Sequence, residues 1–245
     1  MSEMVRNAAG RLVPTVVNGE PQVPYEGIQG IKPQGHKRGP LLARCSDFPA
    51  NGDKRLTTIK EALQRCGIKD GMTISSHHHF RNGDLVANMV FDAAAELGIK
   101  DLRWFPSAAF PCHAPIIGHM DNGVVRWIEG SLNGPLGHYA SFGKMKGTAV
   151  LRSHGGRWQA IQDGDIHIDI AVLAAPTADA FGNATGDRGP SACGSLNFGL
   201  ADSRYADKVI VVTDNLVPFP CLPWQVQGND VDFVVEVEQV GIPEK

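Results

Sequence analysis

Residues 71–84, Gly71-Met-Thr-Ile-Ser-Ser-His-His-His-Phe-Arg-Asn-Gly-Asp84, decide the fold that this sequence predicts. Residues 72–76 have the composition of a short buried strand, and Asp84 begins a helix. The apolar residues of that helix recur at helical spacing: Leu85, Val86, Met89, Val90, Ala93, Ala94 and Leu97. The loop between them carries three imidazoles and a guanidinium. Because open α/β sheets bind ligands at the carboxyl ends of their strands, we expect this loop to belong to a functional site.

The same alternation of strand and helix continues to the end of the chain. Further strands are expected at 101–107, 123–129, 148–153, 168–175, 208–213 and 231–237. Further helices are expected at 114–121, 136–144, from His154 for about seven residues, and at 196–205, with a first one that Thr57 or Thr58 caps and that ends at about Cys66. We therefore expect one open α/β domain over residues 55–245, with a mostly parallel sheet of about six or seven strands and helices on both faces. The Pro- and Gly-rich residues 1–54 predict an extended arm, with disorder as the alternative.

The composition limits the classes of function. The chain has 245 residues, 42% of them hydrophobic and 20% charged, and its net charge of −3 offers no basic surface for nucleic acid. Its five cysteines include no C-x-x-C pair, so we expect free thiols in a reducing cytoplasm: Cys45, Cys66, Cys112, Cys193 and Cys221. No apolar run reaches the roughly 18 residues that cross a bilayer, so neither secretion nor membrane insertion is expected.

Three polar loops follow predicted strands, at His77, His154 and Asp179. The carboxyl ends of parallel strands share one edge of a sheet, so we expect these loops to form a single site. In the first loop, strand geometry directs His77 and His79 to one side and His78 to the other, so at most two of these histidines bind one metal ion. No H-E-x-x-H spacing accompanies them. A hydrogen-bonding or polarising role is favoured, with metal binding and a structural role as alternatives.

The segment His154-Gly155-Gly156-Arg157 predicts an anion site, because glycines at a helix N-terminus expose backbone N–H groups and an arginine grips a carboxylate with two donors. An equally favoured interpretation is a tight strand-to-helix turn, which needs glycine only for its backbone angles. Residues 176–193 form a long predicted loop, and a loop of this length is more often functional than idle. It contains Asp179, Gly182 and Asn183, which by themselves predict an ordered loop. A nucleophilic serine near Gly194 is disfavoured, because no G-x-S-x-G spacing is present.

Several sequence blocks, taken in order, resemble the alpha chain of bacterial citrate lyase, a relative of family I coenzyme A transferases. The likeness extends over about residues 55–240 and rests on these blocks: Gly71-Met-Thr-Ile-Ser75, His77-His-His-Phe-Arg81, Asp84, Asn122-Gly-Val-Val125, Arg152-Ser-His-Gly-Gly-Arg157, Asp179-x-x-Gly-Asn183, Cys193-Gly-Ser-Leu196, Tyr205-Ala-Asp-Lys-Val209 and Thr213-Asp-Asn-Leu-Val217.

That resemblance implies a citrate CoA-transferase, which moves the thioester of an acyl carrier from acetate to citrate. It also implies three partners: an acyl-carrier subunit bearing a CoA-like prosthetic group, a beta subunit that cleaves the citryl carrier, and a second CoA-transferase half. Family members are about twice as long as this chain, and their nucleophilic glutamate lies in the second half. No cofactor bound by this chain and no catalytic nucleophile within it are expected, and we expect an oligomer.

The same resemblance implies which residues of the first half face the substrate and the acyl group. They are His77, His79, Arg81, Asn82, His154, Gly155, Gly156, Arg157, Asp179, Gly182, Asn183 and Gly194. Two other functions stay open from the residues alone. One is a non-catalytic binding or assembly module, and the other is a metal-dependent hydrolase built on the histidine triplet.

Overall fold

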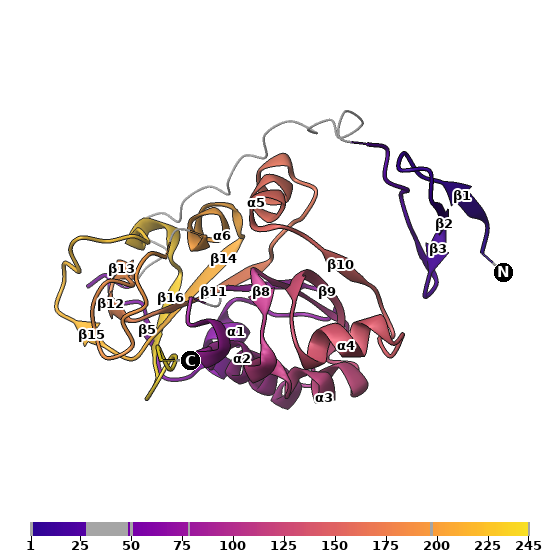
Figure 1. Cartoon of the computed structure of the whole chain (residues 1–245). Coiled ribbons are helices and arrows are strands. Elements are labelled where there is room, and N and C mark those ends of the chain that lie inside the picture. The colour runs from indigo at the N-terminus through magenta and orange to yellow at the C-terminus, as the bar shows by residue number, and fades with distance from the viewer. Residues whose placement is uncertain (1, 28–48, 50, 78, 197, 245) are drawn as a thin grey trace.

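The computed structural model describes residues 2–27, 49, 51–77, 79–196 and 198–244. Its largest feature is a nine-stranded sheet (Figure 1). The strands are β5 (Arg55–Leu56), β6 (Thr73–His77), β7 (Leu102–Pro106), β8 (Ala108–Ala109), β9 (Val125–Leu132), β10 (Ala149–Leu151), β11 (Ile170–Ala175), β14 (Lys208–Thr213) and β16 (Phe233–Glu236). All their pairings are parallel, which confirms the predicted open parallel sheet. The sequence missed only β5 and β8, because two residues are too short to show a period.

The strand order is β10-β9-β7-β6-β11-β14-β16-β5, with β8 beside β9. From β6 the chain builds the sheet outward through β7, β9 and β10. It then returns to the other side of β6 with β11 and continues outward through β14 and β16. The direction of winding therefore reverses between β6 and β11, where His77 lies opposite Leu173. Such a reversal is the place where doubly wound sheets bind their ligands.

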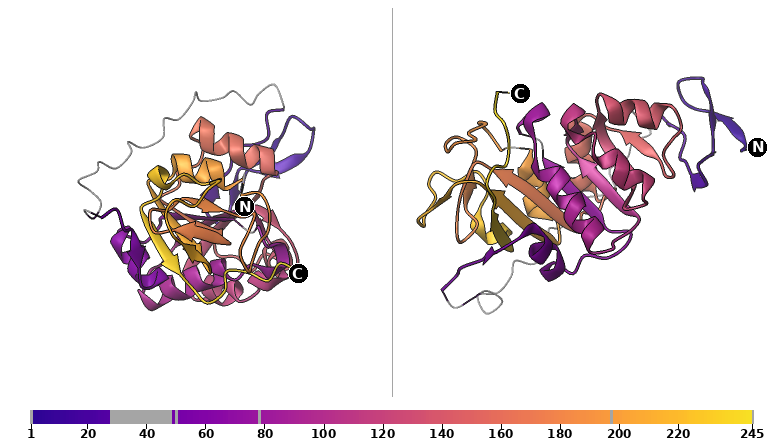
Figure 2. Two further views of the ribbon diagram at one scale, coloured as in Figure 1. Left: turned by 90° about the vertical axis from the view of Figure 1, so that its left-hand side faces the viewer. Right: turned by 90° about the horizontal axis from the view of Figure 1, so that it is seen from below.

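Helices cover both faces of the sheet, as predicted (Figures 1 and 2). One face carries α1 (Ile59–Arg65), α2 (Val86–Glu96), α3 (Ile116–Asp121) and α4 (Pro135–Ser141), and the other carries α5 (His154–Asp163) and α6 (Gly199–Tyr205). The described residues also form the single-turn 3₁₀ helices η3 (Arg81–Gly83), η4 (Pro111–His113) and η5 (Gly228–Asp230).

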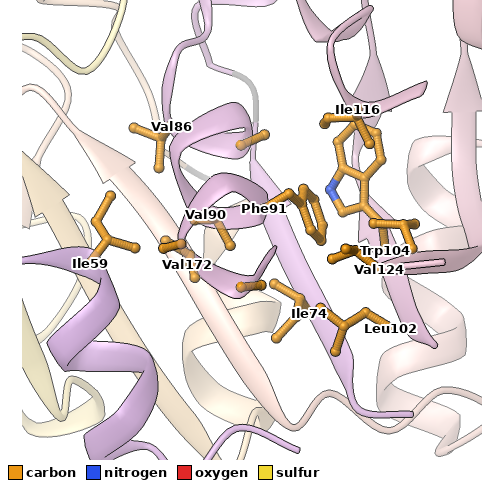
Figure 3. Close-up of a cluster of buried hydrophobic side chains, with 14 of the residues drawn as sticks. Ile59, Ile74, Val86, Val90, Phe91, Leu102, Trp104, Ile116, Val124 and Val172 are labelled. Carbon is orange, nitrogen blue, oxygen red and sulfur yellow. The ribbon is translucent and has the colours of Figure 1, made fainter. Parts of the chain in front are cut away.

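Strand β11 shows why the sheet has two apolar faces. Ile170, Val172 and Ala174 belong to the hydrophobic cluster under α1 and α2, whereas their neighbours Ala171, Leu173 and Ala175 belong to the cluster under α5 and α6. Every residue of β11 is buried, which accounts for its continuous apolar sequence. Figure 3 shows the first cluster, where side chains of α2 pack on those of β6 and β7: Val86, Val90, Phe91, Ile74, Leu102 and Trp104.

The predicted helix ends agree with the structure at α1 and differ at α5. The hydroxyl of Thr58 accepts a hydrogen bond from the Glu61 backbone at 3.0 Å, so the predicted N-cap of α1 is confirmed. Helix α5 has ten residues rather than about seven. It continues to Gly164, whose φ of +79° ends it in the left-handed conformation that glycine adopts freely.

Two regions differ from the sequence prediction. Residues 176–193 are not only a loop, since they contain β12 (Thr177–Asp179) and β13 (Ala184–Thr185), which form a small sheet with β15 (Leu216–Val217). These strands are too short for a recognisable period.

Within the predicted arm, residues 2–27 form two antiparallel ribbons rather than one extended segment: β1 (Met4–Arg6) with β2 (Leu12–Pro14), and β3 (Val16–Val17) with β4 (Glu20–Pro21). They project from the body (Figure 1), to which Asn18 anchors them by donating to Met145 O and Gly147 O. The rest of the arm, residues 28–48 with Cys45, lies outside the described residues. None of the helices in the described ranges has the length and hydropathy that a bilayer crossing requires.

Lys54 connects the segment before β5 to η5 and the residue that follows it. Its buried Nζ donates to Gly228 O and Val231 O, each at 2.7 Å, and burial lowers the pKa of its ammonium group. We predict that Lys54→Met lowers the free energy of unfolding by about 1–3 kcal/mol, because two buried carbonyl groups lose their donor. Urea denaturation followed by tryptophan fluorescence measures this change.

Lys60→Met is the matched control. Lys60 pairs with Glu96 at 3.0 Å on the surface, where such pairs contribute about 0–1 kcal/mol. Equal losses of stability for the two variants would contradict the role given to Lys54.

Candidate functional site

A buried group of charged and titratable side chains lies at the carboxyl end of β6. The Asp202 carboxylate accepts from Arg157 through both oxygens, at 2.5 Å from Nη2 and 2.9 Å from Nη1, and lies 2.7 Å from His77 Nε2. Arg157 Nη1 is 3.2 Å from the same imidazole nitrogen. The three residues are at most 3% exposed. They come from β6, α5 and α6, so they join the central strand to both helices of one face.

The charges in this group follow from its surroundings. Burial favours the neutral acid, but the positive charge of Arg157 outweighs it and holds the pKa of Asp202 well below its usual range. Burial also lowers the pKa of His77, against the attraction of Asp202, so the imidazole is neutral. An ionised carboxylate only accepts hydrogen bonds, so Nε2 of His77 carries the proton and Nδ1 carries the lone pair.

Helix α5 places the guanidinium. Ser153 caps the helix by accepting from the Gly156 amide at 3.1 Å, and Arg157 follows within the first turn. Its side chain runs inward over the ring of Phe105 at 4.3 Å and donates to the Phe105 carbonyl at 3.0 Å. The glycines of this segment therefore serve a helix start whose fourth residue, Arg157, reaches the core of the site.

Above the buried group lies a more exposed layer of rings. The ring of His79 stacks on that of His77, with centroids 5.4 Å apart and planes at 17°. The ring of His154 lies 4.9 Å from that of Phe198. A side chain at Gly199, the next residue, would approach His79 Nε2 to 3.9 Å, so both histidines border the start of α6. Gly155 is exposed and faces open space.

The structure thus brings together half of the residues singled out from the sequence, with the addition of Asp202. We call this group the β6 edge site; it comprises His77, His79, His154, Gly155, Gly156, Arg157 and Asp202.

One interpretation of Arg157 needs correction. The sequence predicted that its guanidinium grips a carboxylate of a ligand, but Nη1 and Nη2 are used by Asp202 and by the Phe105 carbonyl. The carboxylate that Arg157 holds belongs to the protein. Sequence reasoning missed Asp202, because an aspartate within a predicted helix (196–205) is typical of a solvent-exposed residue. Only the fold, which packs α6 against β6, makes it a site residue.

Arg81, Asn82 and Gly194 have other contacts. Arg81 is exposed and has a φ of +52°, unusual for a residue other than glycine. Asn82 Oδ1 accepts from the Cys112 amide at 2.9 Å, which ties the loop after β6 to η4. Gly194 is exposed on the way to α6, and its amide donates to Gly186 O.

The loop at Asp179 is ordered by its own hydrogen bonds. The buried carboxylate of Asp179 accepts from the amides of Phe181, Asn183 and Cys221 and from Asn183 Nδ2, at 2.8–3.1 Å. Gly182 has a φ of +93°, and a Cβ there would come within 2.6 Å of Val231. The expected single site therefore joins the His77 and His154 loops, whereas the contacts of Asp179 lie within the small β12–β13–β15 sheet and its connections.

A second group of side chains of the kinds that bind metal ions lies at the amino ends of the strands, opposite the β6 edge site. Among the described residues, His167, Asp169 and Asp207 have ligand atoms within 4.8 Å of one another, and His167 Nε2 is 2.7 Å from Asp207 Oδ2. Asp169 and Asp207 directly precede β11 and β14. Asp169 also accepts from the Thr73 amide at 2.7 Å, which aligns the start of β6. This group was not predicted from the sequence, although its first two members have the His-x-Asp spacing of possible ligands.

The neutral, buried His77 generates a pH prediction. Its pKa in the folded chain is lower than the value of about 6.5 of an exposed histidine, so the unfolded chain binds the proton first. The free energy of unfolding should fall as the pH drops below about 6.5, by at most about 1.4 kcal/mol per pH unit from this group. The pKa of Asp202 lies below this window, so its ion pair persists.

Urea denaturation of wild type and His77→Gln between pH 7.5 and 5.0 measures the effect. The variant should show a shallower fall in stability, and the difference between the two curves isolates His77 from the other histidines. Parallel curves would mean that His77 is not held neutral.

Comparisons with known proteins agree with this fold. The family model for the alpha subunit of citrate lyase matches residues 52–245. The citrate lyase alpha chain of Haemophilus influenzae is 44% identical over 197 residues, which are 80% of this chain and 39% of that protein. The chain thus spans about two fifths of this relative's length. An acyl-CoA transferase from Escherichia coli O157:H7, at 16% identity and a TM-score of 0.58 over 80% of this chain and 51% of that one, shares the fold.

Among solved structures, the citrate lyase alpha subunit of Streptococcus mutans, determined in complex with citrate, superposes with a TM-score of 0.80 at 48% identity. The match covers 85% of this chain and 40% of that one. Because the family model covers most of the chain from β5 to the last described residues, this chain belongs to the citrate lyase alpha subunit family.

Proposed function

We propose that this chain supplies the citrate-binding half of a citrate CoA-transferase. In that reaction the thioester of an acyl carrier passes from acetate to citrate, and the nucleophilic glutamate comes from a second half. Membership of the citrate lyase alpha subunit family carries this proposal. The match covers 38–42% of the lengths of the curated citrate lyase alpha chains.

The β6 edge site suits the chemistry of thioester exchange. Citrate has three carboxylates, and acyl transfer passes through an oxyanion at a tetrahedral carbon, so fixed donors of hydrogen bonds stabilise both the substrate and the transition state. His79, His154 and the exposed backbone of Gly155 at the start of α5 are groups of this kind. The thioester itself arrives on the CoA-like prosthetic group of the carrier subunit, which acts as a substrate of this site.

A binding or assembly module is the second candidate, and one observation favours it. The ribbons formed by residues 2–27 expose large apolar side chains, 40–86% of whose surface is accessible: Met4, Leu12, Val16, Val23 and Tyr25. Apolar side chains on a projecting ribbon are typical of a surface that contacts another chain. Light scattering at micromolar concentration tests whether this chain self-associates.

A metal-dependent hydrolase has less support. Such an enzyme needs imidazole nitrogens available to the ion, but Nε2 of His77 is bonded to Asp202 and the neighbouring guanidinium places a positive charge 3.2 Å away. Metal analysis of the purified protein distinguishes this alternative from the transferase.

The transferase proposal predicts an exchange activity. The chain, complemented by the remaining part of a citrate lyase alpha chain, should convert acetyl carrier and citrate to citryl carrier and acetate. We predict that His79→Gln lowers kcat/KM for citrate by on the order of 10²-fold, because a donor to the developing oxyanion is lost. A coupled assay of acetate release measures the rate.

The matched control is His138→Gln, since His138 is an exposed histidine of α4 whose ring stacks on Phe142 away from this site. Its activity should equal that of wild type. If the complemented wild-type chain forms a stable complex yet exchanges no acyl group with citrate, the assembly module becomes the better account.

A further inference from the structure

The buried ion pair of the β6 edge site has an energetic cost that the fold alone does not explain. Removing two charges from water is expensive, and apolar residues of similar volume often stabilise a core equally well or better. Arg157 and Asp202 are 3% and 0% exposed. The pair is therefore closed off from solvent, and its contacts within the protein indicate what it does.

Those contacts converge on one imidazole. Asp202 Oδ2 accepts from both Arg157 Nη1, at 2.9 Å, and His77 Nε2, at 2.7 Å, while Oδ1 accepts from Nη2. The two-pronged contact with Arg157 fixes the plane of the carboxylate, and the carboxylate in turn fixes the plane and tautomer of His77. Arg157 is itself held by the Phe105 carbonyl and ring, so the whole group is anchored to β7.

The orientation passes from His77 to His79 through their stacked rings, 5.4 Å apart and 17° from parallel. His79 is partly exposed, whereas His77 is 2% exposed. A neutral His77 also lets the neighbouring ring carry a positive charge without facing a second imidazolium. Gly199 lies at the far side, where any larger residue would approach His79 Nε2.

We propose that Arg157 and Asp202 are positioning residues, which fix the tautomer of His77 and, through it, the ring plane of His79, the imidazole that meets the substrate. This inference rests on the transferase function proposed above and assigns a role to two residues that do not contact the substrate. It also explains why the guanidinium points inward from a helix start that could have presented it to an anion.

The double variant Arg157→Met/Asp202→Leu tests the proposal, because it removes both charges together and leaves neither one buried alone. In the complemented enzyme we expect unchanged circular dichroism, a KM for citrate within about threefold of wild type, and a kcat lower by on the order of 10–10²-fold from the misplaced His79. Retained kcat in a folded double variant would overturn the proposal, since the pair would then serve only the fold.

A second measurement does not depend on activity. Nitrogen-15 NMR of the imidazoles in the wild-type chain should show His77 neutral at pH 7, in the single tautomer with the proton on Nε2. In the double variant both tautomers should appear. A wild-type His77 that is protonated at pH 7, or protonated on Nδ1, overturns the proposal even if the double variant fails to fold.

The two failures can be told apart. If the complemented wild-type enzyme exchanges no acyl group with citrate, the proposed function fails, while the NMR result for His77 still decides whether the pair fixes its tautomer. If exchange occurs and the double variant keeps its kcat, only the positioning role fails.

Discussion

The contact between Arg157 and Asp202 is the interaction on which the carboxyl edge of this sheet depends. Neither charge can be buried alone, since removing one partner of such a pair costs about 3–5 kcal/mol. The need to keep them together ties α5 to α6, and through His77 and the Phe105 carbonyl it ties both helices to β6 and β7. Helix α6, with only seven residues, is thereby anchored to the strand below it.

The topology explains why this pair lies where chemistry is expected. The sheet reverses its winding between β6 and β11, and doubly wound sheets bind their ligands at the carboxyl ends of the strands where this happens. The start of α5 directs backbone N–H groups toward the same edge, and His79 and His154 border it. His167, Asp169 and Asp207 lie at the opposite, amino ends of the strands. Asp169 accepts from the Thr73 amide at the start of β6, and His167 pairs with Asp207, which directly precedes β14.

The parts of this structure that repeat a local pattern could be predicted from the sequence. The long parallel strands, the two-sided burial of β11 and the Thr58 cap follow from composition and spacing alone. The residues that were missed act through contacts distant in sequence. Asp202 contacts His77, which is 125 positions away in the sequence, and Lys54 contacts Val231, which is 177 positions away. The residues that neighbour Asp202 and Lys54 in the sequence do not indicate these partners. Arg157 is a similar case. The sequence around it predicts that its guanidinium binds an anion, but it does not predict that this anion is the carboxylate of Asp202.

The central claim is that citrate binds at the carboxyl end of β6, against rings held by a buried ion pair, in a site completed by a second half. A crystal structure of this chain with its complementary half and citrate tests it most directly. The account predicts citrate within hydrogen-bond distance of His79 and the start of α5, with Arg157 still paired to Asp202. Citrate bound at the Asp179 loop, or held directly by a guanidinium of Arg157 that has left Asp202, would contradict it.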